Sequence, residues 1–242
     1  MIESLKGVRD LLFPRRCVIC EEVLSTVEKD ICLECFSSLP LTYHWDIVQN
    51  SAFERMAAYL EIEAAASLFR FSDTSDYPRL LYGIKYGGRR KLGYRLGYML
   101  GRRLASSAEI SGSGPSGNGF SGIGVVAPVP LHPLRMWKRG YNQAGEIARG
   151  VADALGVPYE GHLFKRVKLT RTQTRLSGKK KAANVRGAFR LVGKVADRLS
   201  SSGVNKILVV DDVMTSGSTL SECAGTAIGR FKVCAATLGF VE

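Results

Sequence analysis

The chain has 242 residues, 45% of them hydrophobic and 23% charged, which is ordinary for a globular protein with room for one sizeable domain and a small one. The formal net charge of +12 fits polyanionic partners such as phosphorylated metabolites, nucleic acid or an acidic membrane, although it also serves simple solubility. No apolar run approaches the roughly 18 residues that a membrane-spanning helix needs, so no membrane span is expected.

The N-terminal sequence, MIESLKGVRDLLFPRRC, mixes acidic and basic residues and lacks the apolar core of a signal peptide. We therefore expect a cytoplasmic protein, in which disulfides are rare. The chain has only three histidines, His44, His132 and His162, which leaves little room for histidine-based metal sites or catalytic triads.

Four of the six cysteines form two close pairs, Cys17 with Cys20 and Cys32 with Cys35. Two such C-x2-C pairs supply the four thiolates of a tetrahedral Zn²⁺ site, which we expect to be closed and structural. The alternatives are a redox pair, which normally lies in a βαβ context that is absent here, and two incidental pairs. The remaining cysteines are expected to be small buried hydrophobes: Cys223 and Cys234.

Short strands are expected in segment 53–71, which mixes aromatic and small residues. Residues 77–106 have the apolar spacing of two helices broken at Gly87 and Gly88. Four basic residues cluster at this break: Lys85, Arg89, Arg90 and Lys91. By default, we expect them to lie at a solvated helix end. The Gly/Ser-rich segment 106–122 is expected to be a flexible surface loop within one domain.

The next strand is expected at residues 123–130, and a helix with an apolar face follows at residues 144–155. Between them lies an expected loop with three cations, Arg135, Lys138 and Arg139. Cations just past the carboxyl end of a strand lie where an open α/β sheet binds its ligand. A solvated, basic helix start is the weaker alternative.

Segment 163–191 is strongly basic in its middle, between Lys168 and Arg186, and shows little hydrophobic periodicity. A mobile loop that closes over an anionic ligand has this composition, and so does a nucleic-acid-binding loop. The sequence leaves both interpretations open.

Residues 207–220, ILVVDDVMTSGSTL, combine an expected buried strand, the acid pair Asp211 and Asp212, and a hydroxyl-rich turn that enters a helix. Backbone N–H groups at a helix N-terminus bind anions, and paired carboxylates suit sugar hydroxyls or hydrated Mg²⁺. The stretch therefore predicts a site for a phosphorylated sugar. Helix-like VGKVADRLSSS precedes it and strand-like KVCAATLGFV follows it, and this alternation predicts a mostly parallel sheet covered on both faces.

The stretch VVDDVMTSGSTL resembles the signature with which type I phosphoribosyltransferases bind 5-phosphoribosyl-1-pyrophosphate (PRPP). The order C-x2-C…C-x2-C, IKYGGR, PVPLHPLRMWKRGYNQA, RTQTRLSGKKKAANVRGAF and then this signature resembles the ComF/GntX family over nearly the whole chain. The resemblance implies an α/β type I phosphoribosyltransferase fold at residues 51–242 and a zinc-ribbon-like module at residues 1–50. It also implies a link to DNA uptake in natural transformation.

The resemblance implies roles for individual residues. Asp211 and Asp212 would bind the ribose 2′ and 3′ hydroxyls, directly or through Mg²⁺. With them, the catalytic set would include the pyrophosphate-side cations Arg135, Lys138 and Arg139. The 5-phosphate would be held by Val213, Met214, Thr215, Ser216, Gly217, Ser218 and Thr219. A flexible hood would carry Arg171, Gln173, Thr174 and Arg186. Lys85 matches the family's K-[YF] motif, for which no role is assigned.

This sequence departs from the family pattern at several positions. Ser216 and Ser218 replace a threonine and an alanine in the phosphate loop, and both keep or add a hydroxyl. Tyr141 replaces the commoner Phe, and Lys180 and Lys181 stand where arginines are usual. Lysine keeps the charge but loses the planar fork, which puts a bidentate contact in question.

Two functions from different classes follow. The chain is a glycosyltransferase that substitutes at the ribose anomeric carbon with pyrophosphate as the leaving group, or it is a non-catalytic protein on the same fold. The second would sense PRPP or bind single-stranded DNA beside a competence helicase. No residue identifies the attacking nucleophile.

Overall fold

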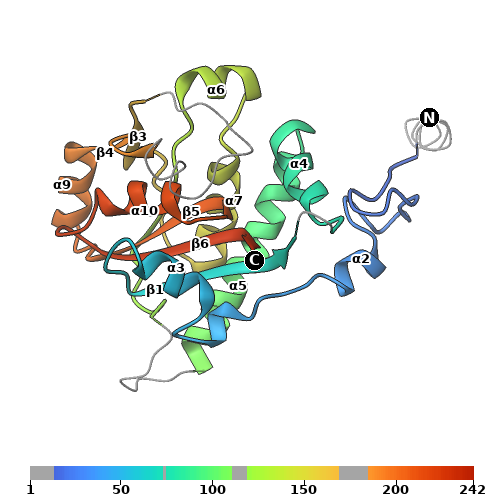
Figure 1. Ribbon diagram of the computed structural model, residues 1–242, viewed down its shortest axis with the longest axis horizontal. Coiled ribbons are helices and arrows are strands. Elements are labelled where there is room, and N and C mark those ends of the chain that lie inside the picture. The colour runs from blue at the N-terminus through green and yellow to red at the C-terminus, as the bar shows by residue number, and fades with distance from the viewer. Residues whose placement is uncertain (1–13, 73–74, 111–118, 169–184) are drawn as a thin grey trace.

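The computed structural model describes residues 14–72, 75–110, 119–168 and 185–242. Its centre is a four-stranded parallel sheet with the strand order β1-β6-β5-β2 (Figure 1). Every residue from Val233 to Phe240 in the inner strand β6 is buried, because helices cover both faces and leave no polar side to the strand. The strands of this sheet are β1 (Ala64–Phe71), β2 (Val125–Pro128), β5 (Lys206–Met214) and β6 (Lys232–Val241).

Two helical layers cover the sheet, and each has its own apolar core. One face packs against α4 (Pro78–Tyr86), α5 (Arg90–Ile110) and α7 (Gln143–Leu155). The other face packs against α3 (Ser51–Ala57), α9 (Gly193–Ser201) and α10 (Ser218–Gly225). The predicted α/β architecture, with a mostly parallel sheet covered on both sides, is therefore confirmed.

Helices α5 and α7 approach each other closely enough to require glycine. A Cβ on Gly97 would lie 2.2 Å from the carbonyl oxygen of Ile147, and a Cβ on Gly150 would lie 2.1 Å from that of Tyr94. Both distances are far below van der Waals contact, so a larger residue would force the helices apart.

Two small elements stand beside the carboxyl ends of β2 and β5. Helix α6 (Pro133–Arg139) follows β2, and β3 (Phe164–Arg166) pairs with β4 (Phe189–Leu191) in a two-stranded antiparallel sheet. The prediction of a loop around Arg135 was wrong, because Pro133 starts a helical turn and Gly140 ends it in the left-handed conformation with φ 74°.

The N-terminal part is a small module, and its described residues, from residue 14 onward, contribute no strand to either sheet. A bridge between Arg16 and Val23 and the short helix α2 (Leu33–Ser37) shape it. The chain then reaches the sheet edge, where Leu41 pairs with Phe69, and continues into η1 (His44–Asp46). In Figure 1 the module lies beside α4 and α5. Among the helices of the described residues, none has the length and apolarity needed to cross a membrane.

Three further sequence predictions need correction. Segment 53–71 is not all strand, because Asn50 caps α3 by accepting hydrogen bonds from the N–H groups of Ala52 and Phe53. Helix α5 continues to Ile110, into the segment predicted as a loop, and buried Ser107 donates a hydrogen bond to the carbonyl of Trp45. Strand β5 includes the acid pair and ends only at Met214. The helix break at Gly87 and Gly88 is confirmed.

Candidate functional site

The acid pair, Asp211 and Asp212, lies near the carboxyl end of strand β5. The N–H group of Asp212 donates a 2.8 Å hydrogen bond to Oδ1 of Asp211. Burial and the neighbouring charge of Asp212 raise the pKa of Asp211 to about 7. Asp211 is thus an acid whose charge changes near neutral pH and whose ionised form needs a nearby cation.

Lys85 supplies one such cation from the last turn of α4. Its Nζ lies 2.9 Å from Oδ2 of Asp212, and both side chains are largely shielded from solvent. The charge of Asp212 raises the pKa of Lys85, which therefore stays an ammonium. The sequence placed Lys85 in a motif without a role, and the fold shows that it is part of this site.

A hydroxyl-lined turn connects β5 to α10. Met214 is buried at the end of the strand, and Gly217 adopts a left-handed conformation with φ 76° as the N-cap of α10. The hydroxyl oxygens of Ser216 and Ser218 lie 3.0 Å apart. The turn therefore gathers hydroxyls at the positive end of an eight-residue helix, an arrangement that suits a phosphate group.

Helix α6 carries two arginines, Arg135 and Arg139, and the charge of Arg139 is felt by Lys85. Arg139 donates hydrogen bonds to Oε1 of Gln143 at 2.9 Å and to the hydroxyl of Tyr86 at 3.2 Å. Arg135 is half-buried, and burial together with the charge of Arg139 lowers its pKa. The side chain of Lys138 lies outside the described residues.

Arg166 on β3 belongs to the same cluster, although the sequence did not single it out. It is only 8% exposed, and its guanidinium lies 5.1 Å from the centre of the Phe189 ring. Burial and the charge of Arg135 lower its pKa, whereas Asp211 raises it. These opposing influences place Arg166 within electrostatic reach of both groups. The sequence did not distinguish Arg166 from the other cations of the basic segment 163–191.

Of the predicted hood, Arg171, Gln173 and Thr174 lie outside the described residues. Arg186 is described and exposed, and its carbonyl accepts a 3.0 Å hydrogen bond from Nζ of Lys168. The next N–H group, that of Gly187, donates to Oε1 of Glu222 on α10. The base of this segment is therefore tied to the helix that begins at the hydroxyl-lined turn.

Three contacts hold α4 and the start of α5 against α6 and the start of α7. Tyr86 contacts Arg139, Arg90 donates a 2.8 Å hydrogen bond to the carbonyl of Gly140, and the hydroxyl of Tyr141 donates to the carbonyl of Ile84. Tyr86 and Ile84 are the neighbours of Lys85 in the chain, so these contacts hold the end of α4 that carries Lys85 in place.

The four N-terminal cysteines form a second centre. Their Sγ atoms all lie within 4.8 Å of one another. The N–H of Cys32 donates to Sγ of Cys17, and the N–H of Cys35 donates to Sγ of Cys32, each at 3.4 Å. Although burial opposes it, backbone N–H donors led by Cys32 lower the pKa of Cys17 to about 6. Four close sulfurs with N–H donors to two of them fit a structural Zn²⁺ ion.

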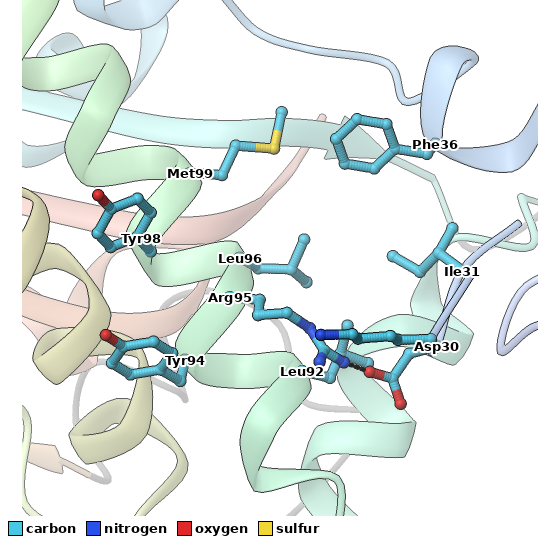
Figure 2. A pocket seen from close by; sticks show the side chains of 10 residues that line it. Asp30, Ile31, Phe36, Leu92, Tyr94, Arg95, Leu96, Tyr98 and Met99 are labelled. Carbon is cyan, nitrogen blue, oxygen red and sulfur yellow. Dashed lines mark ion pairs between the residues drawn. The ribbon is translucent and has the colours of Figure 1, made fainter. Parts of the chain in front are cut away.

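The N-terminal module that contains the four cysteines, called the zinc module below, packs on α4 and α5. Asp30 pairs with Arg89 at 3.2 Å and with Arg95, and Arg79 donates a 2.9 Å hydrogen bond to the carbonyl of Ile19. Figure 2 shows the Asp30–Arg95 pair at one end of a cavity of about 550 Å³ between the module and α5. Apolar side chains from both sides line it: Ile31, Phe36, Leu92, Leu96 and Met99.

Residues 8–45 match the double zinc ribbon domain. Competence protein F of Haemophilus influenzae is 40% identical over 98 residues, which are 40% of this chain and 41% of that protein. DNA utilization protein YhgH of Salmonella typhi is 36% identical over 99 residues, 41% of this chain and 40% of that protein. These matches span about two fifths of the relatives' lengths. YhgH of Escherichia coli K12 is 24% identical over 208 residues, 86% of this chain and 82% of that protein.

Among solved structures, this chain aligns with glutamine PRPP amidotransferase from B. subtilis, with 19% identity and a TM-score of 0.37. The alignment covers 63% of this chain and 29% of that one. An allosteric regulatory enzyme of purine biosynthesis aligns with 20% identity and a TM-score of 0.31, over 59% of this chain and 25% of that one. In sequence, the chain is therefore similar to competence protein F and to the YhgH DNA utilization proteins, and residues 8–45 match a double zinc ribbon.

Proposed function

We propose that this chain binds PRPP with Mg²⁺ at the carboxyl end of β5 and transfers the phosphoribosyl group to a nucleophile. The observation that carries the proposal is the acid pair Asp211 and Asp212 directly before a hydroxyl-lined helix N-terminus. The carboxylates would accept hydrogen bonds from the ribose 2′ and 3′ hydroxyls. The turn Val213–Thr219 would hold the 5-phosphate through N–H and hydroxyl donors.

The charges around the acid pair fit a divalent cation. Asp211 and Asp212 carry two potential negative charges, and Lys85 pairs with only one of them. Their carboxylate oxygens are the ligands that Mg²⁺ prefers, and the ion would supply charge neutralisation for the departing pyrophosphate. On the other side, Arg135, Arg139 and Arg166 would hold the pyrophosphate oxygens.

The proposed reaction is a substitution at the anomeric carbon of the ribose. The lone pair of the nucleophile forms a bond to C1, the bond from C1 to the pyrophosphate oxygen breaks, and its electron pair leaves with pyrophosphate. Positioning and charge stabilisation are the contributions that these residues are able to make. None of the described side chains near the acid pair acts as the nucleophile in this scheme, so the acceptor is a second substrate.

The test is pyrophosphate release from PRPP across a panel of nucleophiles that includes ammonia, amino acids and nucleobases. We expect release that depends on one class of acceptor and disappears in the Asp211→Ala/Asp212→Ala variant. Asp197→Ala, which removes an exposed acid on α9, is the matched control and should react like the wild type. PRPP binding without release for any acceptor would leave a ligand-sensing protein, and absence of binding would reject the proposal.

A second candidate function, binding of single-stranded DNA, is favoured by exposed aromatic side chains on α4 and α6, the helices that carry Lys85 and Arg139. Trp137 on α6 is 88% exposed, and Tyr82 and Tyr86 on α4 are 66% and 59% exposed. The two tyrosine rings lie 4.8 Å apart, and Arg139 lies over Tyr86. Exposed rings beside cations suit unpaired bases and their phosphates. The names of the relatives, competence protein and DNA utilization protein, agree with this candidate.

Tryptophan fluorescence tests the second candidate, because the other tryptophan, Trp45, is only 2% exposed. A single-stranded oligonucleotide should quench Trp137, and binding should weaken steeply as salt rises. Trp137→Leu should weaken binding by about tenfold, whereas Tyr59→Leu, at an exposed tyrosine after α3, should not. Unchanged fluorescence at low salt would remove this candidate.

Two broader features belong to the proposal. We divide the chain into a zinc-binding module at residues 1–50 and a phosphoribosyltransferase-like domain at residues 51–242. We also place the protein in the cytoplasm, which agrees with six free cysteines, since thiols stay reduced there.

A further inference from the structure

Arg55, from the second turn of α3, lies directly beneath the hydroxyl-lined turn. Its Nη1 donates a 2.5 Å hydrogen bond to the carbonyl of Thr215 and a 2.6 Å hydrogen bond to the carbonyl of Val241. Nothing in the sequence connected this residue with the turn, which lies 160 positions further along the chain. Its two hydrogen bonds join α3, the turn and the last residues of β6.

Other contacts fix the guanidinium in place. It lies 4.0 Å from the centre of the Phe240 ring, a cation–π contact that stabilises this position. A Cβ on Gly217 would lie 3.5 Å from Cγ of Arg55 and 3.7 Å from Sδ of Met56, so both residues support the turn from below. The hydroxyl of Ser221 donates to Sδ of Met56 at 3.2 Å. Helix α3 is thus a platform on which the turn rests.

The hydrogen bond to Thr215 determines the direction of the next N–H group. No described peptide bond is cis, so the bond between Thr215 and Ser216 is trans. In a trans peptide the carbonyl and the following N–H point in opposite directions. Because the carbonyl of Thr215 points at Arg55, the N–H of Ser216 points away from α3. A peptide flip would reverse both groups and would require Arg55 to give up this hydrogen bond.

We infer that Arg55 is a positioning residue that orients the Ser216 N–H toward the 5-phosphate, an inference that rests on the proposed phosphate site. Arg55 acts from behind the turn through the peptide group, without a contact to the phosphate. It therefore governs affinity for ligands with a 5-phosphate. It does not govern affinity for the pyrophosphate side, whose cations lie on α6 and β3.

Two probes separate the two sides: ribose 5-phosphate and inorganic pyrophosphate, each titrated into the full chain. We expect Arg55→Met to weaken ribose 5-phosphate binding by about tenfold to a hundredfold, the range for a lost hydrogen bond to a charged group. Pyrophosphate binding should stay within about twofold. Arg55→Lys should be intermediate, because an ammonium is able to donate to one carbonyl but lacks the planar fork.

Arg70→Met is the matched control, since Arg70 lies at the same end of the sheet and pairs with exposed Glu242. It should bind both probes like the wild type. Equal affinity of the wild type and Arg55→Met for ribose 5-phosphate would overturn the inference, and so would an equal loss of both probes in a folded variant. A wild type that binds ribose 5-phosphate but not PRPP would reject the proposed function and leave the inference standing.

Discussion

Nζ of Lys85 lies 2.9 Å from Oδ2 of Asp212, and this ion pair connects α4 to the carboxyl end of β5. It also connects the two centres of the molecule. Helix α4 packs with its other side on the zinc module, where a Cβ on Gly83 would lie 3.2 Å from Cγ1 of Val18 and where Arg79 holds the carbonyl of Ile19. Val18 and Ile19 lie between the first two zinc-binding cysteines. The zinc module thus supports the helix that carries Lys85.

The first prediction concerns the charge of Lys85. Its ammonium lowers the pKa of Asp211, which burial and Asp212 raise to about 7. PRPP·Mg²⁺ binding needs the ionised acid, so affinity should increase as the pH rises through about 7. In Lys85→Met the pKa of Asp211 should rise further, which moves this increase upward by about one pH unit and weakens binding near neutrality by about tenfold.

Calorimetric titrations across the pH range measure this effect. Lys85→Arg should resemble the wild type because it keeps the charge. Lys91→Met, at an exposed position on the first turn of α5, is the control for a general loss of positive charge. A Lys85→Met profile that superimposes on that of the wild type would show that Lys85 does not act on the acid pair.

The second prediction concerns stability. The native state raises the pKa of Asp211 from 3.8 to about 7, so between these values the native protein holds a proton that the unfolded chain has lost. The free energy of unfolding attributable to this group therefore decreases as the pH rises from about 4 to 7. Asp211→Asn removes the ionisation. It should be more stable than the ligand-free wild type at alkaline pH, by about 1–3 kcal/mol.

Urea unfolding at pH values from about 4 to 8, which include both pKa values, provides the measurement. The difference between wild type and Asp211→Asn should widen with increasing pH, while other titrating groups contribute equally to both proteins. A constant difference across that range would contradict the raised pKa.

The third prediction concerns zinc. Elemental analysis should find about one zinc per chain, because the described residues form one four-cysteine cluster. Cys35→Ser should lose the metal, whereas Cys223→Ala, at a buried cysteine on α10, should keep it. Few of the module's described residues are buried, so chelation should unfold it. Hydrogen exchange should then increase in residues 15–38 and in α4, and the sheet should stay protected. A chelated protein with unchanged exchange in the module would contradict a structural role for the metal.

The fourth prediction sets helix propensity against packing. Gly150→Ala should gain about 1 kcal/mol of helix propensity. The new Cβ, however, would lie 2.1 Å from the carbonyl of Tyr94 and 2.6 Å from the nitrogen of Tyr98. Forcing α5 and α7 apart costs more than this gain, so we expect a net loss of about 2 kcal/mol in chemical denaturation. Gly225→Ala in α10 has no neighbour within 4 Å and should unfold at the wild-type midpoint or above it. Wild-type stability of Gly150→Ala would contradict the close helix contact.

Local sequence patterns predicted those features of the fold and the site whose residues all lie in one short segment. The buried strand, acids and hydroxyls of residues 207–219 follow one another in the chain, and so do the two cysteine pairs. Helix α6 also had a local signal, since Pro133 and Gly140 mark a helix start and end, but its three cations suggested a loop. Segment 53–57 was ambiguous because its aromatic and small residues suit both helices and strands, and the Asn50 cap decides it.

Contacts between distant segments could not be predicted in this way. Lys85, Arg55 and Arg166 come from α4, α3 and β3, and only the tertiary fold brings them to the site. In a basic protein, a single lysine or arginine without a motif around it is ordinarily expected to be exposed to solvent. The fold is what distinguishes these three from the other lysines and arginines of the chain.

The central claim is that Asp211 and Asp212 hold the ribose of PRPP, and calorimetric titration of PRPP into the full chain tests it most directly. We expect micromolar binding at one site per chain that requires Mg²⁺ and disappears in Asp211→Ala/Asp212→Ala, with Asp197→Ala unchanged. Equal binding by the wild type and the double variant, or no binding by the wild type at alkaline pH, would contradict it.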